Sequence, residues 1–230
     1  MDSVELSPST LSALREFLAE KAAAEEAAKR ESEDTSSRLL TTEDWQLSQF
    51  WYSVDTSNFL AREVVWCLTQ SSADCGVAVF ISSPSAYKAY RASAGEGSAH
   101  EAFLLEFDKR FSIFGKSFVH YDYNDALNLP NPLLGRADVI LLDPPFLNEE
   151  VLCQFSKTVN ALAKPNAKIL MASGAIQLAA AKKYLALRPT KKAVEHEAGR
   201  LSNPFCLFSN YEHEDTLGGW DTDAEAAIFH

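Results

Sequence analysis

The stretch Ala137-Asp138-Val139-Ile140-Leu141-Leu142-Asp143-Pro144-Pro145-Phe146 decides the fold. It begins with a short apolar run, which is typical of a strand buried on both faces of a parallel sheet. Asp143 follows directly, and the two prolines after it cannot continue the ladder because they have no N–H donor. The stretch therefore predicts a buried strand that stops abruptly at a rigid, polar turn.

Similar apolar runs alternate with helical patterns on both sides of this strand. Strands are predicted at 77–81, 102–107, 118–121 and 168–172, and helices at 55–70, 148–163 and 174–187, with another helix opening at Ser83-Pro84. Strands separated by helices predict an α/β fold, with a mainly parallel sheet and helices on both faces. The last two strands, near 191–197 and 205–211, have no helix between them. We therefore expect them to pair as a hairpin and to place an antiparallel strand in the sheet.

The two ends of the chain differ from this central region. Residues 1–40 contain one predicted helix and a polar linker, and we interpret them as an N-terminal helical extension. Residues 41–212 carry the strand and helix pattern and form the predicted α/β domain. Residues 213–230 are rich in aspartate and glutamate, and we interpret them as an acidic C-terminal tail.

The charge and the apolar pattern restrict the partners. The net charge is -11, and an acidic surface repels phosphate backbones, which makes nucleic acid an unfavourable partner. No apolar run reaches the roughly 18 residues that span a membrane, and the start of the sequence has no signal-peptide pattern. We therefore expect a cytoplasmic monomer with no membrane partner.

Ligands of open parallel sheets bind at the carboxyl ends of the strands. The predicted segments at that edge are Ser82-Ser83-Pro84, Asp108-Lys109-Arg110, Asp122-Tyr123-Asn124-Asp125 and Asp143 to Phe146. The first segment lacks the GxGxxG glycines that approach a pyrophosphate, which disfavours NAD and FAD. S-adenosylmethionine has no phosphate, and carboxylates at this edge suit its ribose hydroxyls, its adenine amine and its cationic sulfonium.

Asp143-Pro144-Pro145-Phe146 has the chemistry of an amine-binding turn. The prolines fix the backbone, so a carbonyl held outward and the Asp143 carboxylate form a pair of hydrogen-bond acceptors. A primary amine carries N–H donors that match this pair, and Phe146 offers a ring face to a cation or a planar amine. This chemistry alone leaves lysine, adenine and glutamine open as acceptors of a methyl group.

The sequence predicts no metal site. The histidines show neither HxxxH nor HExxH spacing, and the four cysteines form no CxxC pair. His120 lies inside a predicted strand, and we expect its side chain to be packed there.

Asp143-Pro144-Pro145-Phe146 resembles the (Asp/Asn)-Pro-Pro-(Tyr/Phe) motif of seven-strand N-methyltransferases that use S-adenosylmethionine. Further segments resemble the eukaryotic protein-lysine N-methyltransferase family that modifies translation elongation factor 1-alpha, a family first labelled as an N6-adenine DNA methyltransferase. These segments are Trp45–Ser53, Glu106–Phe111, Tyr121–Asn124, Ser173–Ile176 and Asn210-Tyr211. The resemblance covers roughly residues 41–212 and implies a Rossmann-like class I fold, S-adenosylmethionine as cofactor, and a lysine of elongation factor 1-alpha as acceptor.

The resemblance also implies roles for individual residues. Asp108 would bind the ribose, Asp122 and Tyr123 the adenine, and the loop at Ser82 the methionine part, while the segment containing Trp51 would cover the cofactor or the lysine. The implied cofactor-binding residues are Ser82, Ser83, Asp108, Lys109, Asp122, Tyr123 and Trp51.

The implied catalytic residues, Asp143, Pro144, Pro145 and Phe146, surround the acceptor nitrogen. Asp143 favours the ammonium form of a lysine, so we interpret it as an orienting group that leaves the proton to water. The alternative function is an N6-adenine methyltransferase, in which Phe146 stacks on a flipped base. The acidic net charge and the lack of room for a target-recognition domain disfavour it.

Overall fold

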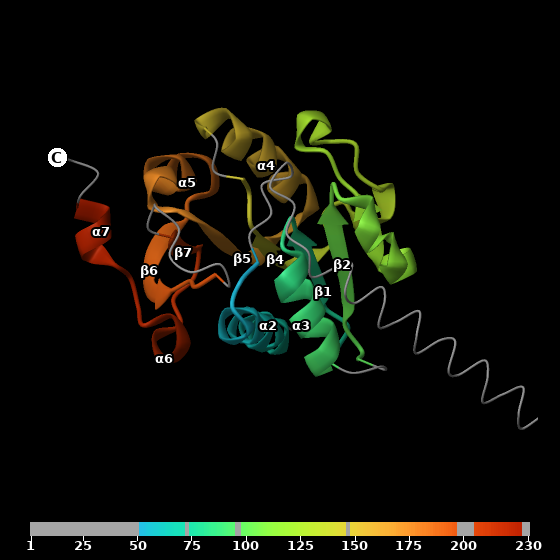
Figure 1. Ribbon diagram of the computed structural model, residues 1–230, viewed down its shortest axis with the longest axis horizontal. Helices are drawn as coiled ribbons and strands as arrows, with labels where there is room; N and C mark the ends of the chain where they lie inside the picture. The colour runs from blue at the N-terminus through green and yellow to red at the C-terminus, as the bar shows by residue number, and fades with distance from the viewer. Residues whose placement is uncertain (1–50, 72–73, 95–97, 146–147, 197–204, 227–230) are drawn as a thin grey trace, which may run out of the picture. The chain divides into compact units, whose positions relative to one another are not determined.

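The computed structural model describes residues 51–71, 74–94, 98–145, 148–196 and 205–226. These residues form one seven-stranded sheet in the order β3-β2-β1-β4-β5-β7-β6 (Figure 1). Its strands are β1 Val77–Ile81, β2 Glu101–Glu106, β3 Phe118–His120, β4 Ala137–Leu142, β5 Ala163–Gly174, β6 Arg188–Ala193 and β7 Phe205–Ser209. The predicted extension, residues 1–40, lies outside the described residues.

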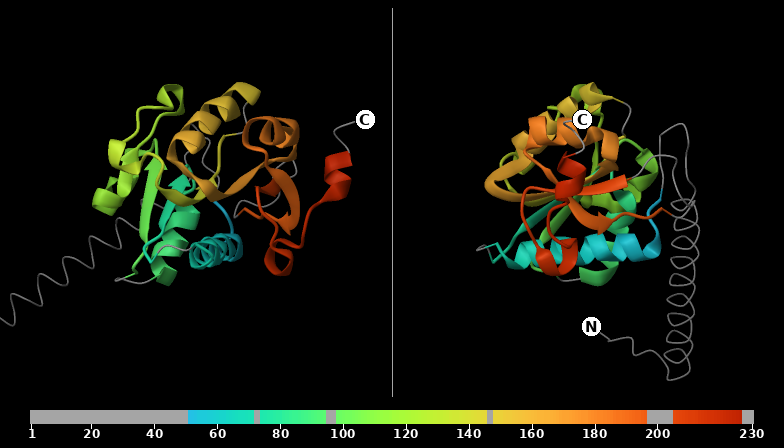
Figure 2. Two further views of the ribbon diagram at one scale, coloured as in Figure 1. Left: turned by 180° about the vertical axis from the view of Figure 1, so that it is seen from behind. Right: turned by 90° about the vertical axis from the view of Figure 1, so that its left-hand side faces the viewer.

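The pairing of the strands confirms the expected α/β class. The strands β3, β2, β1, β4 and β5 pair in parallel, whereas β7 lies antiparallel between β5 and β6. Helices α2 Val54–Thr69 and α3 Pro84–Ala94 cover one face, and α4 Glu149–Leu162 and α5 Leu178–Leu185 cover the other (Figure 2). The fold is therefore a mostly parallel sheet with helices on both faces and one antiparallel strand near the C-terminus.

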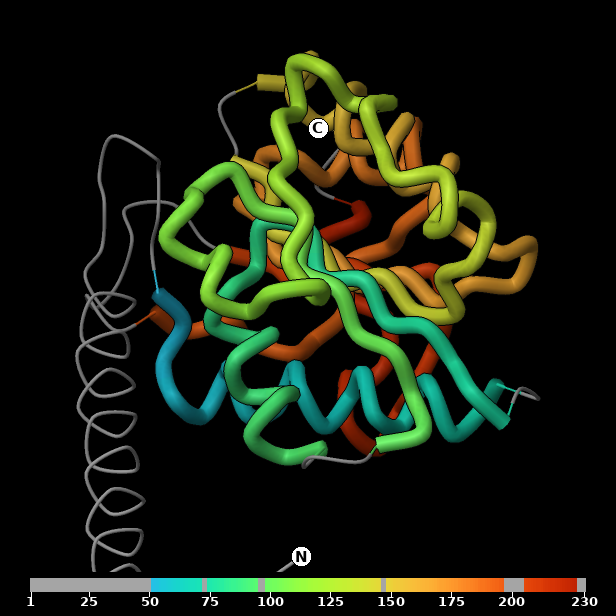
Figure 3. Tube along the Cα trace, turned by 90° about the vertical axis from the view of Figure 1, so that its right-hand side faces the viewer, coloured from blue at the N-terminus to red at the C-terminus, as the bar shows by residue number. Residues whose placement is uncertain are grey.

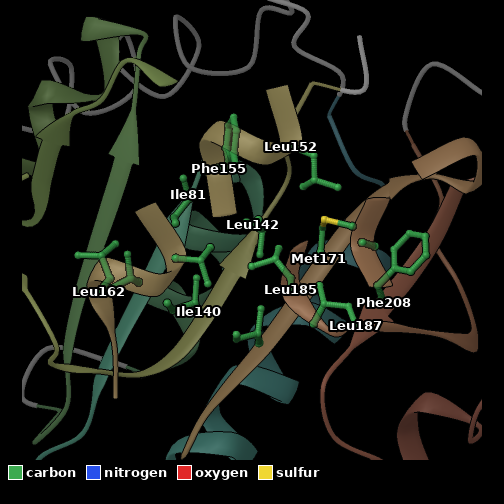
Figure 4. Close-up of a cluster of buried hydrophobic side chains, with 14 of the residues drawn as sticks. Ile81, Ile140, Leu142, Leu152, Phe155, Leu162, Met171, Leu185, Leu187 and Phe208 are labelled. Atoms are coloured by element: carbon green, nitrogen blue, oxygen red, sulfur yellow. The ribbon is translucent and has the colours of Figure 1, made fainter. Parts of the chain in front are cut away.

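The main core lies between the sheet and the layer of α4 and α5 (Figure 4). Ile140 and Leu142 of β4 and Met171 of β5 point into it, and all three are fully buried. Successive side chains of a strand point to opposite faces. The residue after Leu142, which is Asp143, therefore faces the layer of α2 and α3.

Two polar caps fix where the helices begin. The Ser53 side chain accepts a hydrogen bond from the N–H of Thr56 at 3.2 Å and caps α2. The Asn148 side chain accepts from the N–H of Val151 at 3.0 Å and caps α4, as its position in the sequence predicts. Capping groups of this kind satisfy N–H donors that have no partner inside the helix.

The structure differs from the sequence-based expectation at several element ends, among them α5, which begins at Leu178 instead of 174, and at one side chain. Strand β5 begins at Ala163 instead of 168, and β6 begins at Arg188 instead of 191. His120 is exposed, and its ring lies 5.5 Å from that of Phe107. The expectation that His120 is packed was wrong, because β3 is an edge strand with little covering it.

The described part of the acidic C-terminal segment, residues 213–226, contains the short helices α6 Glu214–Leu217 and α7 Thr222–Ala226. The part of this segment that contains α6 lies beside α2 (Figure 1 and Figure 3, α6 in red and α2 from blue to cyan). Leu217 is fully buried. This part of the chain is therefore packed against the domain.

A buried carboxylate on α2 holds the C-terminal segment. Glu63, with a side chain 1% exposed, accepts from Tyr211 Oη at 3.0 Å and Thr216 Oγ1 at 2.7 Å. The same carboxylate lies 2.8 Å from Nδ1 of His213. Because a buried carboxylate without partners is costly, these groups stabilise both α2 and the segment that supplies them.

None of the helices in the described ranges combines the length and the apolar character that a membrane crossing requires.

Leu217→Ala should lower the free energy of unfolding by about 2–4 kcal/mol, because it leaves a cavity under the C-terminal segment. Leu127→Ala is the matched control, since Leu127 is 63% exposed, and it should cost under about 0.5 kcal/mol. Urea denaturation followed by circular dichroism measures both. Equal, small losses in the two variants would contradict the packing of residues 213–226.

Candidate active site

Backbone hydrogen bonds fix the relative positions of the central strand ends. The N–H of Asp143 donates to the carbonyl of Ile81 at 3.0 Å, just where β4 and β1 finish. The N–H of Ser82 donates to the carbonyl of Leu105 at 2.8 Å, which joins the ends of β1 and β2. The polar groups that follow these three strands are therefore held at one edge of the sheet.

A tyrosine that is distant in the sequence holds the Asp143 side chain. Tyr52 Oη donates to Asp143 Oδ2 at 2.5 Å, and the Tyr52 side chain is 2% exposed. The backbone of Tyr52 forms an antiparallel bridge with His196, and the N–H of Ser53 donates to the carbonyl of Glu195 at 2.9 Å. The segment before α2 is thus fastened to the segment after β6 and reaches the end of β4.

Two carboxyl groups at this edge have raised pKa values. Burial, opposed by the Tyr52 hydrogen bond, raises the pKa of Asp143 to about 8, and the charge of Glu106 adds to the rise. Burial raises the pKa of Glu106 to about 7, although a hydrogen bond from the Asp108 N–H lowers it in part. A cation in contact with these groups would favour their charged forms. The pair therefore suits a positively charged occupant such as a sulfonium or an ammonium group.

Tyr52 is a hydrogen-bond donor in this arrangement. Burial, together with the neighbouring Asp143 charge, raises the pKa of Tyr52 well above its usual value. The phenol therefore keeps its proton at physiological pH, and its role is to hold the Asp143 carboxylate in place.

Asp108, the predicted ribose ligand, is engaged within its own turn. Its carboxylate accepts from the Arg110 N–H at 2.9 Å and from Arg110 Nε at 2.7 Å. Glu106 is the last residue of β2 and only 6% exposed, and sequence reasoning gave it no role. One feature of the sequence could have indicated a role for Glu106: it is a charged residue directly after the apolar run Ala102–Leu105, at the carboxyl end of the strand, where ligands bind.

The other residues of the first two loops differ in their surroundings. Ser82 has a φ of 52°, an uncommon conformation for a residue with a side chain, and makes the sharp bend after β1. Ser83 is 1% exposed, and its hydroxyl donates to the carbonyl of Leu141 at 3.4 Å. Lys109 is exposed, and no described contact directs it to the site.

Three further predicted residues lie elsewhere: Asp122 and Tyr123 follow β3, and Trp51 precedes α2. Asp122 Oδ1 accepts from the N–H of Asn124 at 2.9 Å, and the Tyr123 ring lies 5.9 Å from that of Phe155. Trp51 is 6% exposed and packs edge-on against Phe111 at 6.1 Å.

The proline turn after Asp143 is described only in part. Pro144 is buried and Pro145 partly buried, whereas Phe146 lies outside the described residues. In the part of the chain that the structure describes, no group of three or more His, Cys, Asp or Glu side chains could hold a metal ion.

The chain resembles known proteins over most of its length. The family model described as "Probable N6-adenine methyltransferase" matches residues 43–213. EEF1A lysine methyltransferase 1 of Gallus gallus is 37% identical over 211 residues, which cover 91% of this chain and 95% of that protein. A protein-lysine N-methyltransferase of Dictyostelium discoideum is 36% identical, covering 94% of this chain and 95% of that protein.

One further relative and one solved structure are more distant from this chain. A protein-lysine N-methyltransferase of Saccharomyces cerevisiae is 33% identical, covering 90% of this chain and 92% of that protein. Among solved structures, a SAM-dependent methyltransferase from Aquifex aeolicus is 11% identical, with a TM-score of 0.41, and covers 66% of this chain and 90% of that chain. The sequence relatives decide the assignment, because they match at 33–37% identity over nearly whole chains. The chain therefore belongs to this family of protein-lysine N-methyltransferases.

Proposed function

We propose that the chain transfers a methyl group from S-adenosylmethionine to the side-chain amine of a lysine in translation elongation factor 1-alpha. The observation that carries the chemistry is the enclosed Asp143 carboxylate, held by Tyr52 at the end of the central strand. The substrate is supported by the Gallus gallus relative, which is named for its action on EEF1A and is matched over 95% of its length.

The described residues fit the cofactor by the chemistry of their donors and acceptors. S-adenosylmethionine supplies a methyl group that its cationic sulfonium has already activated. Glu106 is buried at the end of β2, where a carboxylate can accept hydrogen bonds from ribose hydroxyls. Asp108 and Lys109 support that turn in our proposal, and Trp51 covers it by packing on Phe111.

The loops on either side complete the proposed cofactor site. Ser82 and Ser83 line the methionine part, because their loop follows β1 directly. Asp122 and Tyr123 contact the adenine from the loop after β3. No phosphate has to be bound, which agrees with the absence of a glycine-rich loop in this part of the sequence.

Asp143 has an orienting role in the proposed reaction. As a carboxylate it attracts the lysine ammonium and fixes the nitrogen, while the Pro144-Pro145 turn and Phe146 surround it. Burial of the amine lowers its pKa, and the proton leaves to water before the nitrogen attacks. Asp143 opposes that pKa shift, so its benefit lies in position and not in proton removal.

The compartment and the partners follow from this substrate. We propose a cytoplasmic enzyme that acts as a monomer on a protein, with residues 1–40 as an extension and 213–230 as an acidic segment outside the catalytic core. The four cysteines are all free of disulfides, as is usual in a reducing compartment.

Purified protein with labelled S-adenosylmethionine should methylate recombinant elongation factor 1-alpha on lysine and leave adenine-containing DNA and RNA oligonucleotides unlabelled. Asp143→Asn should lower kcat/KM for the protein acceptor about 30- to 100-fold, the effect of losing a charge-assisted hydrogen bond. Asp74→Asn, at an exposed aspartate before β1, is the matched control and should keep full activity. Label in adenine, or full turnover by Asp143→Asn with unchanged acceptor binding, would refute the proposal.

Tyr52→Phe should move the acidic limb of the pH profile of kcat/KM to higher pH by about one unit. The Tyr52 hydrogen bond lowers the pKa of Asp143, so its loss raises that pKa, and a higher pH is then needed to form the carboxylate that attracts ammonium. Activity should therefore fall near neutral pH and recover partly above pH 9. An unshifted profile, with activity lost equally at every pH, would show that Tyr52 acts only in packing.

Glu106→Gln should weaken the binding of S-adenosylmethionine about tenfold or more in titration calorimetry, because a neutral amide is a poorer acceptor for two hydroxyls. Asp108→Asn, the comparison variant, should weaken it less, since the Asp108 carboxylate is occupied by Arg110. The reverse ranking would assign the ribose to Asp108, as the sequence alone suggested.

A further inference from the structure

We propose that Tyr52, His196 and Phe205 form the aromatic wall of the channel that receives the acceptor lysine side chain. This inference rests on the proposed function, because it names the residues that select the substrate of the same site. The three residues come from three separate segments: the one before α2, the one after β6, and the first residue of β7.

The topology brings these segments to the catalytic edge. Strand β7 is antiparallel to β5, so its first residue, Phe205, pairs with Gly174 at the carboxyl end of β5. Strand β6 is antiparallel to β7 and therefore runs in the same direction as β5. His196, which follows β6, thus lies at the same edge as Asp143.

The side chains also share one face of the sheet. Phe208 of β7 belongs to the core beneath α4 and α5, so Phe205, three residues earlier, points to the opposite face. Asp143 follows the core residue Leu142 and points to that same face. Between them β5 turns the small residue Ala172 to this face, as the alternation with the core residue Met171 requires.

The ring contacts form a continuous row that ends at the carboxylate. The Phe205 ring lies edge-on to His196 at 4.6 Å, and the His196 ring lies 5.2 Å from that of Tyr52. Tyr52 then donates to Asp143 at 2.5 Å. The N–H of Glu195 donates to Thr56 Oγ1 at 3.1 Å, which fixes the segment after β6 against α2.

This row matches the chemistry of a lysine side chain. Its four methylene groups can lie along ring faces, and its ammonium is attracted by aromatic rings and then by a carboxylate. Apart from Trp51, the cofactor residues proposed above lie at the ends of β1, β2 and β3 or in the loops after them, and these strands lie on the other side of β4 in the sheet order. Asp143 therefore stands between a cofactor half and an acceptor half, and the aromatic row belongs to the acceptor half.

The test compares His196→Ala and Phe205→Ala with the wild type in steady-state methylation of recombinant elongation factor 1-alpha. Each variant should raise KM for the protein acceptor about tenfold while the Kd for S-adenosylmethionine, measured by calorimetry, stays unchanged. His196→Phe should restore the KM, because it keeps a ring at this position. Lys192→Ala is the matched control: Lys192 lies over the Phe59 ring of α2 at 4.3 Å, on the strand that precedes His196, and its loss should leave KM unchanged.

The outcomes separate this inference from the proposed function. If the wild type methylates no lysine, the proposed function fails. If the wild type is active and both alanine variants keep its acceptor KM, only the aromatic channel is refuted. A matching loss of S-adenosylmethionine affinity would also refute it, by assigning the row to the cofactor. Phe205→Leu, which keeps apolar volume without a ring, replaces Phe205→Ala if that variant unfolds, and it should still raise the acceptor KM.

Discussion

The hydrogen bond from Tyr52 to Asp143 is the interaction on which the catalytic edge depends. It joins the segment before α2 to the end of the central strand across 91 positions of sequence. Without a donor at this place, the enclosed carboxyl group would be driven further toward its neutral form, because burial disfavours the charge. A neutral carboxyl would no longer attract an ammonium group. The position of α2 and the segment after β6 therefore matter to chemistry at β4.

Two carboxylates in the same protein, Glu63 and Asp143, differ in how far the surrounding side chains satisfy them. Glu63 receives hydrogen bonds from Tyr211 and Thr216 and pairs with His213, so its surroundings satisfy it in the folded protein itself. The described side-chain hydrogen bond to Asp143 comes from Tyr52, and Glu106 repels it. Within the described residues, Asp143 thus accepts fewer side-chain hydrogen bonds than Glu63 does, which leaves acceptor capacity for a ligand. A site held partly unsatisfied costs stability, which is the usual compromise where a ligand must bind.

Sequence patterns predicted those strands and helices whose buried residues follow a regular pattern along a short stretch of chain. The apolar runs of β1 and β4 predicted buried strands of a parallel sheet. The sequence has no helical pattern between the last two predicted strands, and this predicted the antiparallel strand. Patterns along the chain could not reveal contacts made across the fold. Tyr52 looked like one aromatic residue among several, and Glu106 like an ordinary polar strand end. Their roles follow from burial and from the effect that each has on Asp143, which exist only after the strands have assembled.

The antiparallel strand explains why one edge of the sheet serves two ligands. If β7 were parallel to β5, its last residue, and not Phe205, would lie at the catalytic edge. The antiparallel direction instead brings the first residue of β7 beside the end of β5, next to the segment that follows β6. In the arrangement that we propose, loops after β1, β2 and β3 then remain for the cofactor, and the other half of the sheet supplies rings for the acceptor. Asp143 lies at the boundary because β4 is the strand that pairs with both halves.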